Sequence, residues 1–223
     1  MQHLPLFTGI FFGLTTCTTV LFFYRATHYS KTVLSVLVIW LAIQAVIALT
    51  GFYTVTDVMP PRFPLLIAPA LLFILLLFVT RRGGLFLDQL DLQTLTILHI
   101  VRIPVELILY WLFLFRVIPE VMTFEGLNLD ILSGLTDPLV FYFTFIKKRL
   151  SPKILLIWNI ICLGLLFNIV AYAVLSAPTP FQQLSFDQPN IAVLYFPFIW
   201  LPCCVVPLVL LSHLASIRLL LKK

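Results

Sequence analysis

Long apolar segments separated by short polar connections dominate the chain. A helix needs about 20 residues to cross the roughly 30 Å hydrocarbon core of a bilayer. Seven segments approach or exceed this length, at residues 6–24, 33–53, 63–80, 94–115, 127–146, 154–175 and 191–214. The pattern predicts an all-α, polytopic integral membrane protein with a single seven-helix transmembrane domain over residues 1–223.

The basic residues predict the orientation of these segments. Lys and Arg concentrate in cytoplasmic loops, and acidic residues are not subtracted in this count. Only Arg62 and Arg116 lie in the loops on one side. Eleven lie on the other side, at Arg25, Lys31, Arg81, Arg82, Lys147, Lys148, Arg149, Lys153, Arg218, Lys222 and Lys223. We therefore expect an N-out, C-in topology, which suits a bacterial cytoplasmic (inner) membrane, with an organellar membrane as the alternative.

The composition supports this class. The chain is 61% hydrophobic and 10% charged, whereas soluble domains are about 45–50% apolar and about 25% charged. Because the inner loops account for the net charge of +5, we expect membrane lipids as partners and no nucleic acid.

The cysteines do not indicate a metal or redox centre. All four lie in apolar segments, and no CxxC motif occurs. Free cysteines of this kind behave as small apolar packing residues. We therefore expect no cofactor and no bound metal.

The segment 94–115 carries ionisable residues near its middle. His99, Arg102 and Glu106 are spaced i, i+3, i+7, which places them on one face of a helix. Pro104 lies among them and cannot donate a backbone hydrogen bond to the carbonyl of Ile100. Ionisable groups are costly in hydrocarbon, so these three are candidates for a functional site.

The segment 127–146 repeats this spacing. Asp130, Ser133 and Asp137 again lie at i, i+3, i+7, and Pro138 leaves the carbonyl of Gly134 without its helical donor. Counting helix rise from the segment ends places Glu106 and Asp137 at similar depth, with Asp130 at the outer end of its segment. Successive helices joined by short connections are usually neighbours.

Charge balance suggests how these groups interact. Arg102 is always protonated and requires an anionic partner, for which we expect Glu106 one turn away or Asp137 across the helix interface. One of these two acids would then have no cationic side chain as a partner and could hold a proton, a cation or a polar substrate. His99 could relay a proton. A static network that only ties the two helices together is the alternative.

Two further polar residues are secondary candidates. Asn168 is expected to form an interhelical hydrogen bond. His213 lies near the inner end of its segment, where an interfacial position is the expectation. The prolines 197, 202 and 207 predict that the last segment is kinked or broken.

These features favour a small transporter or channel-like protein for a small polar solute, a proton or another cation, with proton coupling as one form. We also expect that it could form a homo-oligomer. A lipid-binding or assembly subunit is an alternative. A retinal protein is excluded because every lysine lies at the end of a segment or in a loop.

An intramembrane enzyme that acts on a lipid or isoprenoid is the remaining alternative. His99, Asp137 and His213 could bind a metal, or Ser133, His99 and Asp137 could act as a hydrolytic triad. The zinc-binding motif HExxH and the serine-nucleophile motif GxSxG do not occur. The sequence therefore favours a function other than catalysis.

Overall fold

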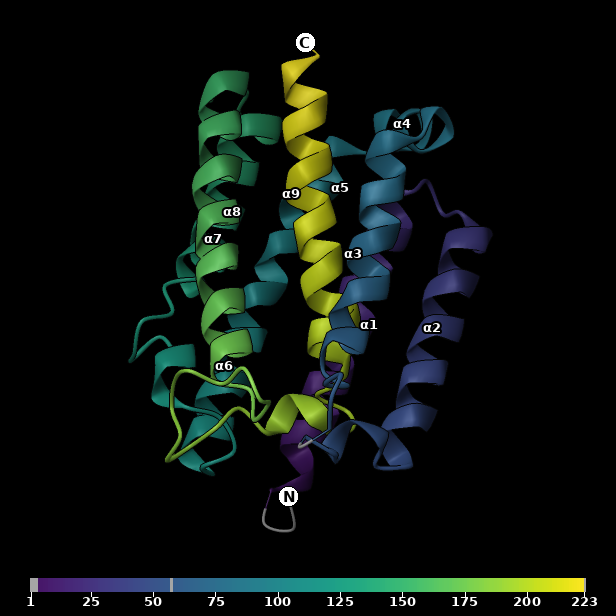
Figure 1. Cartoon of the computed structure of the whole chain (residues 1–223). Helices are drawn as coiled ribbons and strands as arrows, with labels where there is room; N and C mark the ends of the chain where they lie inside the picture. Colours follow the sequence, from purple (N-terminus) through teal and green to yellow (C-terminus); the bar gives the residue numbers. More distant parts are fainter. Residues whose placement is uncertain (1–3, 57, 223) are drawn as a thin grey trace.

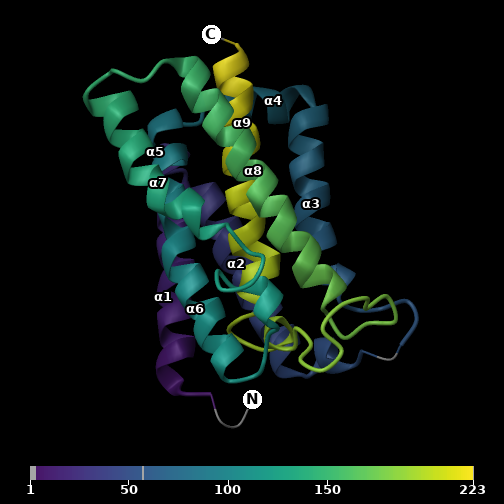
Figure 2. The same ribbon diagram turned by 90° about the vertical axis from the view of Figure 1, so that its left-hand side faces the viewer.

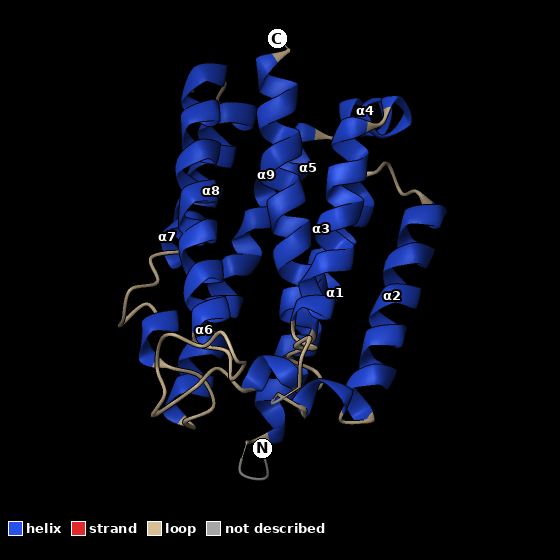
Figure 3. Cartoon of the chain, in the orientation of Figure 1, coloured by secondary structure: helices blue, strands red, loops and turns tan. Residues whose placement is uncertain are grey.

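The computed structural model describes residues 4–56 and 58–222, and this part of the chain contains helices and no strands (Figures 1 and 3). The α-helices are α1 (Leu6–Ala26), α2 (Lys31–Leu49), α3 (Pro64–Val79), α4 (Arg81–Asp88), α5 (Leu92–Ile97), α6 (Arg102–Leu114), α7 (Ile131–Phe141), α8 (Pro152–Leu175) and α9 (Val206–Leu221). Short 3₁₀ segments are η1 (Phe52–Thr54), η2 (Leu98–Val101), η3 (Glu120–Met122) and η5 (Ala192–Leu194). Two π-helical segments, η4 (Tyr142–Ile146) and η6 (Leu201–Val205), continue α7 and precede α9.

Several helices are long and apolar enough to cross a membrane, which indicates a membrane protein. Five meet this condition within the described residues: Leu6–Ala26, Lys31–Leu49, Leu92–Leu114, Pro152–Leu175 and Leu201–Leu221. The apolar α3 and the short α4 count as a sixth if taken together, although the chain bends by 91° between them. Helix length thus supports five or six of the seven predicted spans.

The predicted span at 127–146 differs most from the structure. Its helix begins only at Ile131 and comprises the 11 residues of α7 and the five residues of η4. The preceding residues Asn128 and Asp130 are buried rather than placed at an outer surface. The helix is therefore too short to count as a spanning helix on its own, and its first turn lies inside the bundle.

The last predicted span also begins later than expected. Residues 191–199 form the short segment η5 and turns, and the continuous helix begins only at about Trp200, with the π-helical η6, instead of at Ile191. Pro197 lacks the backbone N–H that a helix interior requires, which explains the delayed start, whereas Pro202 lies in the first turn, where this N–H has no helical partner. The expectation of a broken helix is met by the change from π to α hydrogen bonding between Val205 and Val206.

Helix α9 lies at the centre of the bundle and packs against α8, α5, α3 and α4 (Figures 1 and 2). By contrast, α2 stands at the periphery, where only Gln44 and Ala48 of this helix are buried. The outward faces of the peripheral helices carry exposed aliphatic side chains, as expected for a surface in contact with lipid.

The two ends of the bundle differ in structure. At the end that holds the C-terminus, α4 lies across the bundle (Figure 1). A Cβ at Gly83 would overlap the backbone of Leu77, so the sharp α3–α4 corner requires glycine. Asp88 at the end of α4 accepts hydrogen bonds from Arg218, at 2.8 Å, and from Lys222. At the opposite end, where the N-terminus lies, long loops connect the helices (Figure 3).

Candidate functional site

The candidate site is built around the break in the helical run from α5 to α6. The carboxylate of Asp91 caps α5 by accepting the backbone N–H of Thr94 at 3.0 Å. The helix then tightens to 3₁₀ geometry in η2, directly before Pro104 in the first turn of α6. His99, Arg102 and Glu106 are 0%, 2% and 1% exposed, so the whole predicted face is buried.

Close packing brings α7 against this break. Gly134 lies so near α6 that a Cβ there would be 2.8 Å from Cγ1 of Ile103 and 3.0 Å from its backbone nitrogen. Only glycine allows this approach without displacement of α6. The contact places Asp130, Ser133 and Asp137 on the buried face of α7 and its first turn.

Arg102 forms its ion pair with Asp130, not with the predicted partners. Its Nη1 lies 3.2 Å from Oδ1 of Asp130. Its two terminal nitrogens also donate long hydrogen bonds, of 3.4 and 3.5 Å, to the carbonyl of Cys162 on α8. The expectation that Glu106 or Asp137 pairs with Arg102 is therefore wrong. It failed because α7 begins at Ile131, so Asp130 enters the bundle instead of lying at the outer surface.

Glu106 is held instead by an amide that the sequence analysis did not single out. Nδ2 of Asn128 donates to both carboxylate oxygens of Glu106, at 2.7 Å each, and to the carbonyl of Met122 at 3.0 Å. Oδ1 of Asn128 accepts the backbone N–H of Asp130 at 2.9 Å. Asn128 thus fixes Glu106 and Asp130 relative to each other.

Asp137 is buried and has no direct side-chain partner among the described residues. Neither carboxylate oxygen forms a hydrogen bond of normal geometry within the described residues, although the backbone of Ile100 lies close by. The hydroxyl of Ser133, one turn before, is also buried without a hydrogen bond in this part of the chain. Asp137 and Glu106 both lie within electrostatic reach of Arg102.

His213 is the largest departure from the sequence expectation. It is 0% exposed, not interfacial. Its ring stacks on that of His99 with centroids 3.7 Å apart and planes 12° from parallel. Nδ1 of His213 lies 2.9 Å from Oδ1 of Asn159, which fixes the ring from the α8 side. Trp158 contacts the ring of His99 at an angle of 67°.

The structure also shows how the secondary candidate Asn168 is bound. Asn168 donates to the carbonyl of Leu127 at 3.0 Å, which ties α8 to the segment that enters α7. The predicted hydrogen bond was interhelical, whereas Leu127 lies in the turn before α7. Asn159, which the sequence analysis missed, carried the same signal, an amide within an apolar run.

Neither enzyme alternative gains support from the geometry. Across residues 4–56 and 58–222, no three His, Cys, Asp or Glu side chains are gathered closely enough to hold a metal. Ser133, His99 and Asp137 are not hydrogen-bonded to one another, since their polar side-chain atoms form no hydrogen bonds within this part of the chain.

A small cavity of about 70 Å³ lies beside the site, in the half of the bundle nearer the N-terminus. Glu106, Asp130 and Asn190 contribute to its otherwise mostly apolar lining. Asn190, which precedes η5, donates to the carbonyl of Ala173 at 3.1 Å, while its Oδ1 is buried without a partner among the described residues. Two of the three acids of the site, Glu106 and Asp130, therefore border this cavity.

No known protein family matches this chain, and neither a curated protein nor a solved structure matches it at a significant level.

The charges of the site do not balance within the protein. One guanidinium, that of Arg102, serves three buried carboxyl groups, those of Glu106, Asp130 and Asp137. A buried charge requires a compensating charge or must be neutralised by a proton. Two of the three carboxyl groups therefore need protons or bound cations. The arrangement can take up and release positive charge inside the bundle.

Proposed function

We propose that this protein is a transporter or channel-like protein for a small polar solute or ion, coupled to protons, with its site between α6, α7, α8 and α9. The proposal includes seven spans, an N-out, C-in orientation and a bacterial cytoplasmic membrane. It rests on one observation above all: buried polar side chains, several of them without hydrogen-bond partners among the described residues, continue through the middle of the bundle.

Buried polar groups lie on both sides of Arg102. Towards the N-terminal end of the bundle, Glu106 and Asp130 line the small cavity together with Asn190. Towards the C-terminal end follow Asp137 and the stacked histidines. Ser216, one turn beyond His213 on α9, is also buried with an unpartnered hydroxyl among the described residues. In an apolar interior each such group costs free energy unless water, a proton or a ligand satisfies it.

The residues support distinct roles in this proposal. Glu106 and Asp130 would receive a proton or cation through the cavity. Arg102 would hold the negative charge of Asp130 and would prevent free passage of other cations. Asp137 would accept the proton on the far side of Arg102. The His99–His213 pair would relay one proton at a time, because two imidazolium rings at this separation would repel each other.

The surplus of acidic groups favours transport over a purely static network. A structural network gains most when every buried charge is paired and every polar atom is hydrogen-bonded. Here Asp137, Ser133 and both nitrogens of His99 lack partners within the described residues. Groups in this state are suited to bind a proton, a cation or a small solute reversibly.

Proton flux in liposomes tests the proposal. The protein is reconstituted in vesicles loaded with the pH indicator pyranine, and a membrane potential is imposed with potassium and valinomycin. Monovalent cations, carboxylic acids and amino acids are added outside in turn. We expect proton movement above that of protein-free vesicles with at least one of these solutes, and its loss in Glu106→Gln.

The matched control is Glu120→Gln, because Glu120 is an exposed acid in η3. This variant should transport like the wild type. The proposal is wrong if the wild-type protein moves no protons with any solute of the panel, or if Glu106→Gln transports as fast as Glu120→Gln.

A further inference from the structure

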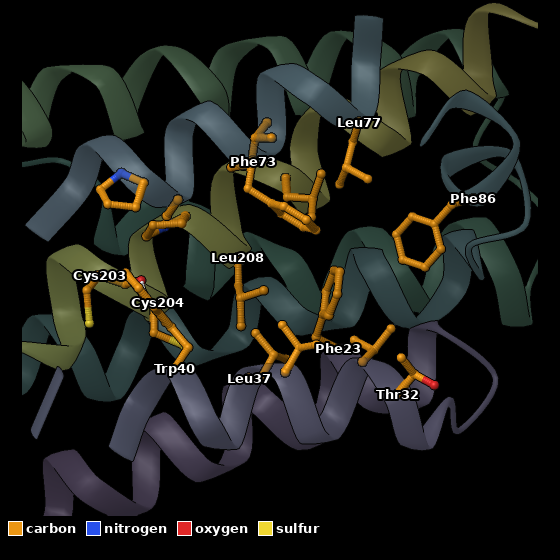
Figure 4. Close-up of a pocket in the computed structure, with 17 residues that line it drawn as sticks. Phe23, Thr32, Leu37, Trp40, Phe73, Leu77, Phe86, Cys203, Cys204 and Leu208 are labelled. Carbon is orange, nitrogen blue, oxygen red and sulfur yellow. Dashed lines mark hydrogen bonds between the residues drawn. The ribbon is translucent and has the colours of Figure 1, made fainter. Parts of the chain in front are cut away.

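A second, larger cavity lies away from the polar site. It has a volume of about 430 Å³ and lies between α2, α3 and α9, with α1 and α4 contributing (Figure 4). Trp40, Phe73, Leu77, Phe86 and Leu208 point towards it in Figure 4. Its volume falls within the range of about 300–1,000 Å³ that is typical of small-molecule sites.

The wall of this cavity is suited only to an apolar occupant. Thr32 is its single hydroxyl-bearing residue, at one end. The indole N–H of Trp40 is already bound, because it donates to the carbonyl of Cys203 at 2.9 Å. Apolar cavities of about 150 Å³ already bind small hydrophobic molecules and exclude water. A site almost three times as large would take a longer hydrocarbon.

The cavity separates only one half of α2 from the bundle. Residues between Thr32 and Trp40 line it, on the half of α2 nearer the C-terminal end of the bundle. The middle of α2 is joined directly to η6 and the residue before it, since the indole of Trp40 donates to the carbonyl of Cys203 at 2.9 Å and the indole of Trp200 donates to the carbonyl of Leu41 at 3.0 Å. An occupant of the cavity would thus replace protein packing along half of this helix.

The cavity has access to the lipid-facing surface. Val36 and Phe73, which line it from α2 and α3, are 53% and 56% exposed. Neighbouring residues on the same helices, such as Ile39 and Leu72, are exposed aliphatics. In a membrane, hydrocarbon chains surround this surface, so a lipid chain could enter the cavity between α2 and α3.

Positive charge marks the end of the cavity at Thr32 and Phe86. Lys31 directly precedes Thr32, and Arg82 lies one turn before Phe86 on α4. Lys31, Arg81 and Arg82 are exposed, and none is in an ion pair within the described residues. Basic groups at the end of a membrane-spanning bundle attract anionic lipid headgroups.

We propose that this cavity binds one acyl chain of an anionic phospholipid, whose headgroup lies against Lys31, Arg81 and Arg82. The lipid fills the space between α2, α3 and α9 and holds half of α2 to the bundle. This proposal does not depend on the transport function.

Lipid retention measured by native mass spectrometry tests the proposal. The purified protein is mixed with phosphatidylglycerol or with phosphatidylcholine of the same acyl chains. We expect one retained phosphatidylglycerol, bound about tenfold more tightly than phosphatidylcholine. Ala70→Phe fills the cavity and should abolish retention. Ala68→Phe is the matched control, because Ala68 is exposed on the same helix and does not line the cavity.

The headgroup contact is tested separately. The combined change of Lys31, Arg81 and Arg82 to Gln should remove the preference for phosphatidylglycerol but keep chain binding. The same change at Lys147, Lys148 and Arg149, another exposed basic cluster, should leave the preference intact. Equal preference in the two triple variants would overturn the headgroup assignment, and equal retention in the two phenylalanine variants would overturn the chain site.

The wild-type protein provides a check that does not depend on folding of a variant. A phosphatidylglycerol with a photoreactive diazirine on its acyl chain is cross-linked to the protein in vesicles, and the labelled residues are mapped by mass spectrometry. We expect labels concentrated on the lining residues of α2, α3 and α9. Labels spread equally onto Ile157 and Ile160, exposed on α8, would contradict the proposal.

Discussion

Replacing Arg102 with Leu should destabilise the bundle strongly, because it leaves Asp130 buried without its cation. Asp130 is only 5% exposed and lies 3.2 Å from Nη1 of Arg102. Leu occupies part of the volume of the arginine stem, so loss of charge compensation is the main change. Removing one partner of a buried ion pair costs about 3–5 kcal/mol of unfolding free energy. Even the lower value raises the unfolding equilibrium constant about a hundredfold.

A second substitution identifies which acid is responsible. Adding Asp130→Asn to Arg102→Leu removes the uncompensated charge and should restore about 0.5–3 kcal/mol, the usual coupling between residues in contact. Asp137→Asn in the same background should restore much less, because Asp137 forms no ion pair with Arg102 within the described residues.

The assay is equilibrium unfolding in mixed detergent micelles, with sodium dodecyl sulfate as denaturant and far-UV circular dichroism as the signal. Each variant is compared with the wild-type protein at the same lipid and detergent content. The reasoning is refuted if Arg102→Leu costs less than about 1 kcal/mol, the level of an exposed ion pair. It is also refuted if Asp137→Asn rescues as well as Asp130→Asn.

Two further predictions concern packing and pH. Gly134→Ala should lower the unfolding free energy by about 1–3 kcal/mol, because its Cβ would overlap Ile103. Gly164→Ala, with open space around its Cβ, should be neutral or slightly stabilising. Equal effects of the two variants in the same unfolding assay would contradict the close approach of α7 to α6. Hydrogen bonds from Arg218 and the neighbouring Lys222 lower the pKa of Asp88, outside the spans, from 3.8 to about 2. Because the pKa is lower in the folded state, this contribution to stability is present above about pH 4 and is lost as the pH falls through about 2. Thermal unfolding between pH 2 and 5 should therefore show a steeper loss for the wild-type protein than for Asp88→Asn, and parallel curves would exclude this linkage.

Hydrophobic pattern predicted most of the helices, because a run of apolar residues near 20 in length has few alternatives in a membrane. Pattern could not predict where α7 begins. The segment 127–146 is mostly apolar. Its first turn is held inside the bundle by the Asn128 hydrogen bonds, the Arg102–Asp130 ion pair and the close contact at Gly134. These contacts are tertiary and leave no periodic signal.

The sequence pattern predicted one part of the site and missed another. Spacing placed His99, Arg102 and Glu106 on one buried face, because the rotation of a helix per residue is fixed. Spacing does not determine which acid meets Arg102, since the pairing depends on the depth of a neighbouring helix. His213 lies about a hundred residues from His99 in the sequence, and only the central position of α9 brings the two rings together.

The most direct test of the central claim is proton flux in Asp137→Asn, measured in pyranine-loaded vesicles beside Asp187→Asn. Asp137 lies beyond Arg102 from the cavity, whereas Asp187 is an exposed acid in the loop before η5. If the buried polar groups form one route through the bundle, Asp137→Asn should lose flux as completely as Glu106→Gln, and Asp187→Asn should keep it. Normal flux in Asp137→Asn, with flux lost in Glu106→Gln, would show that the route does not pass through the buried groups beyond Arg102.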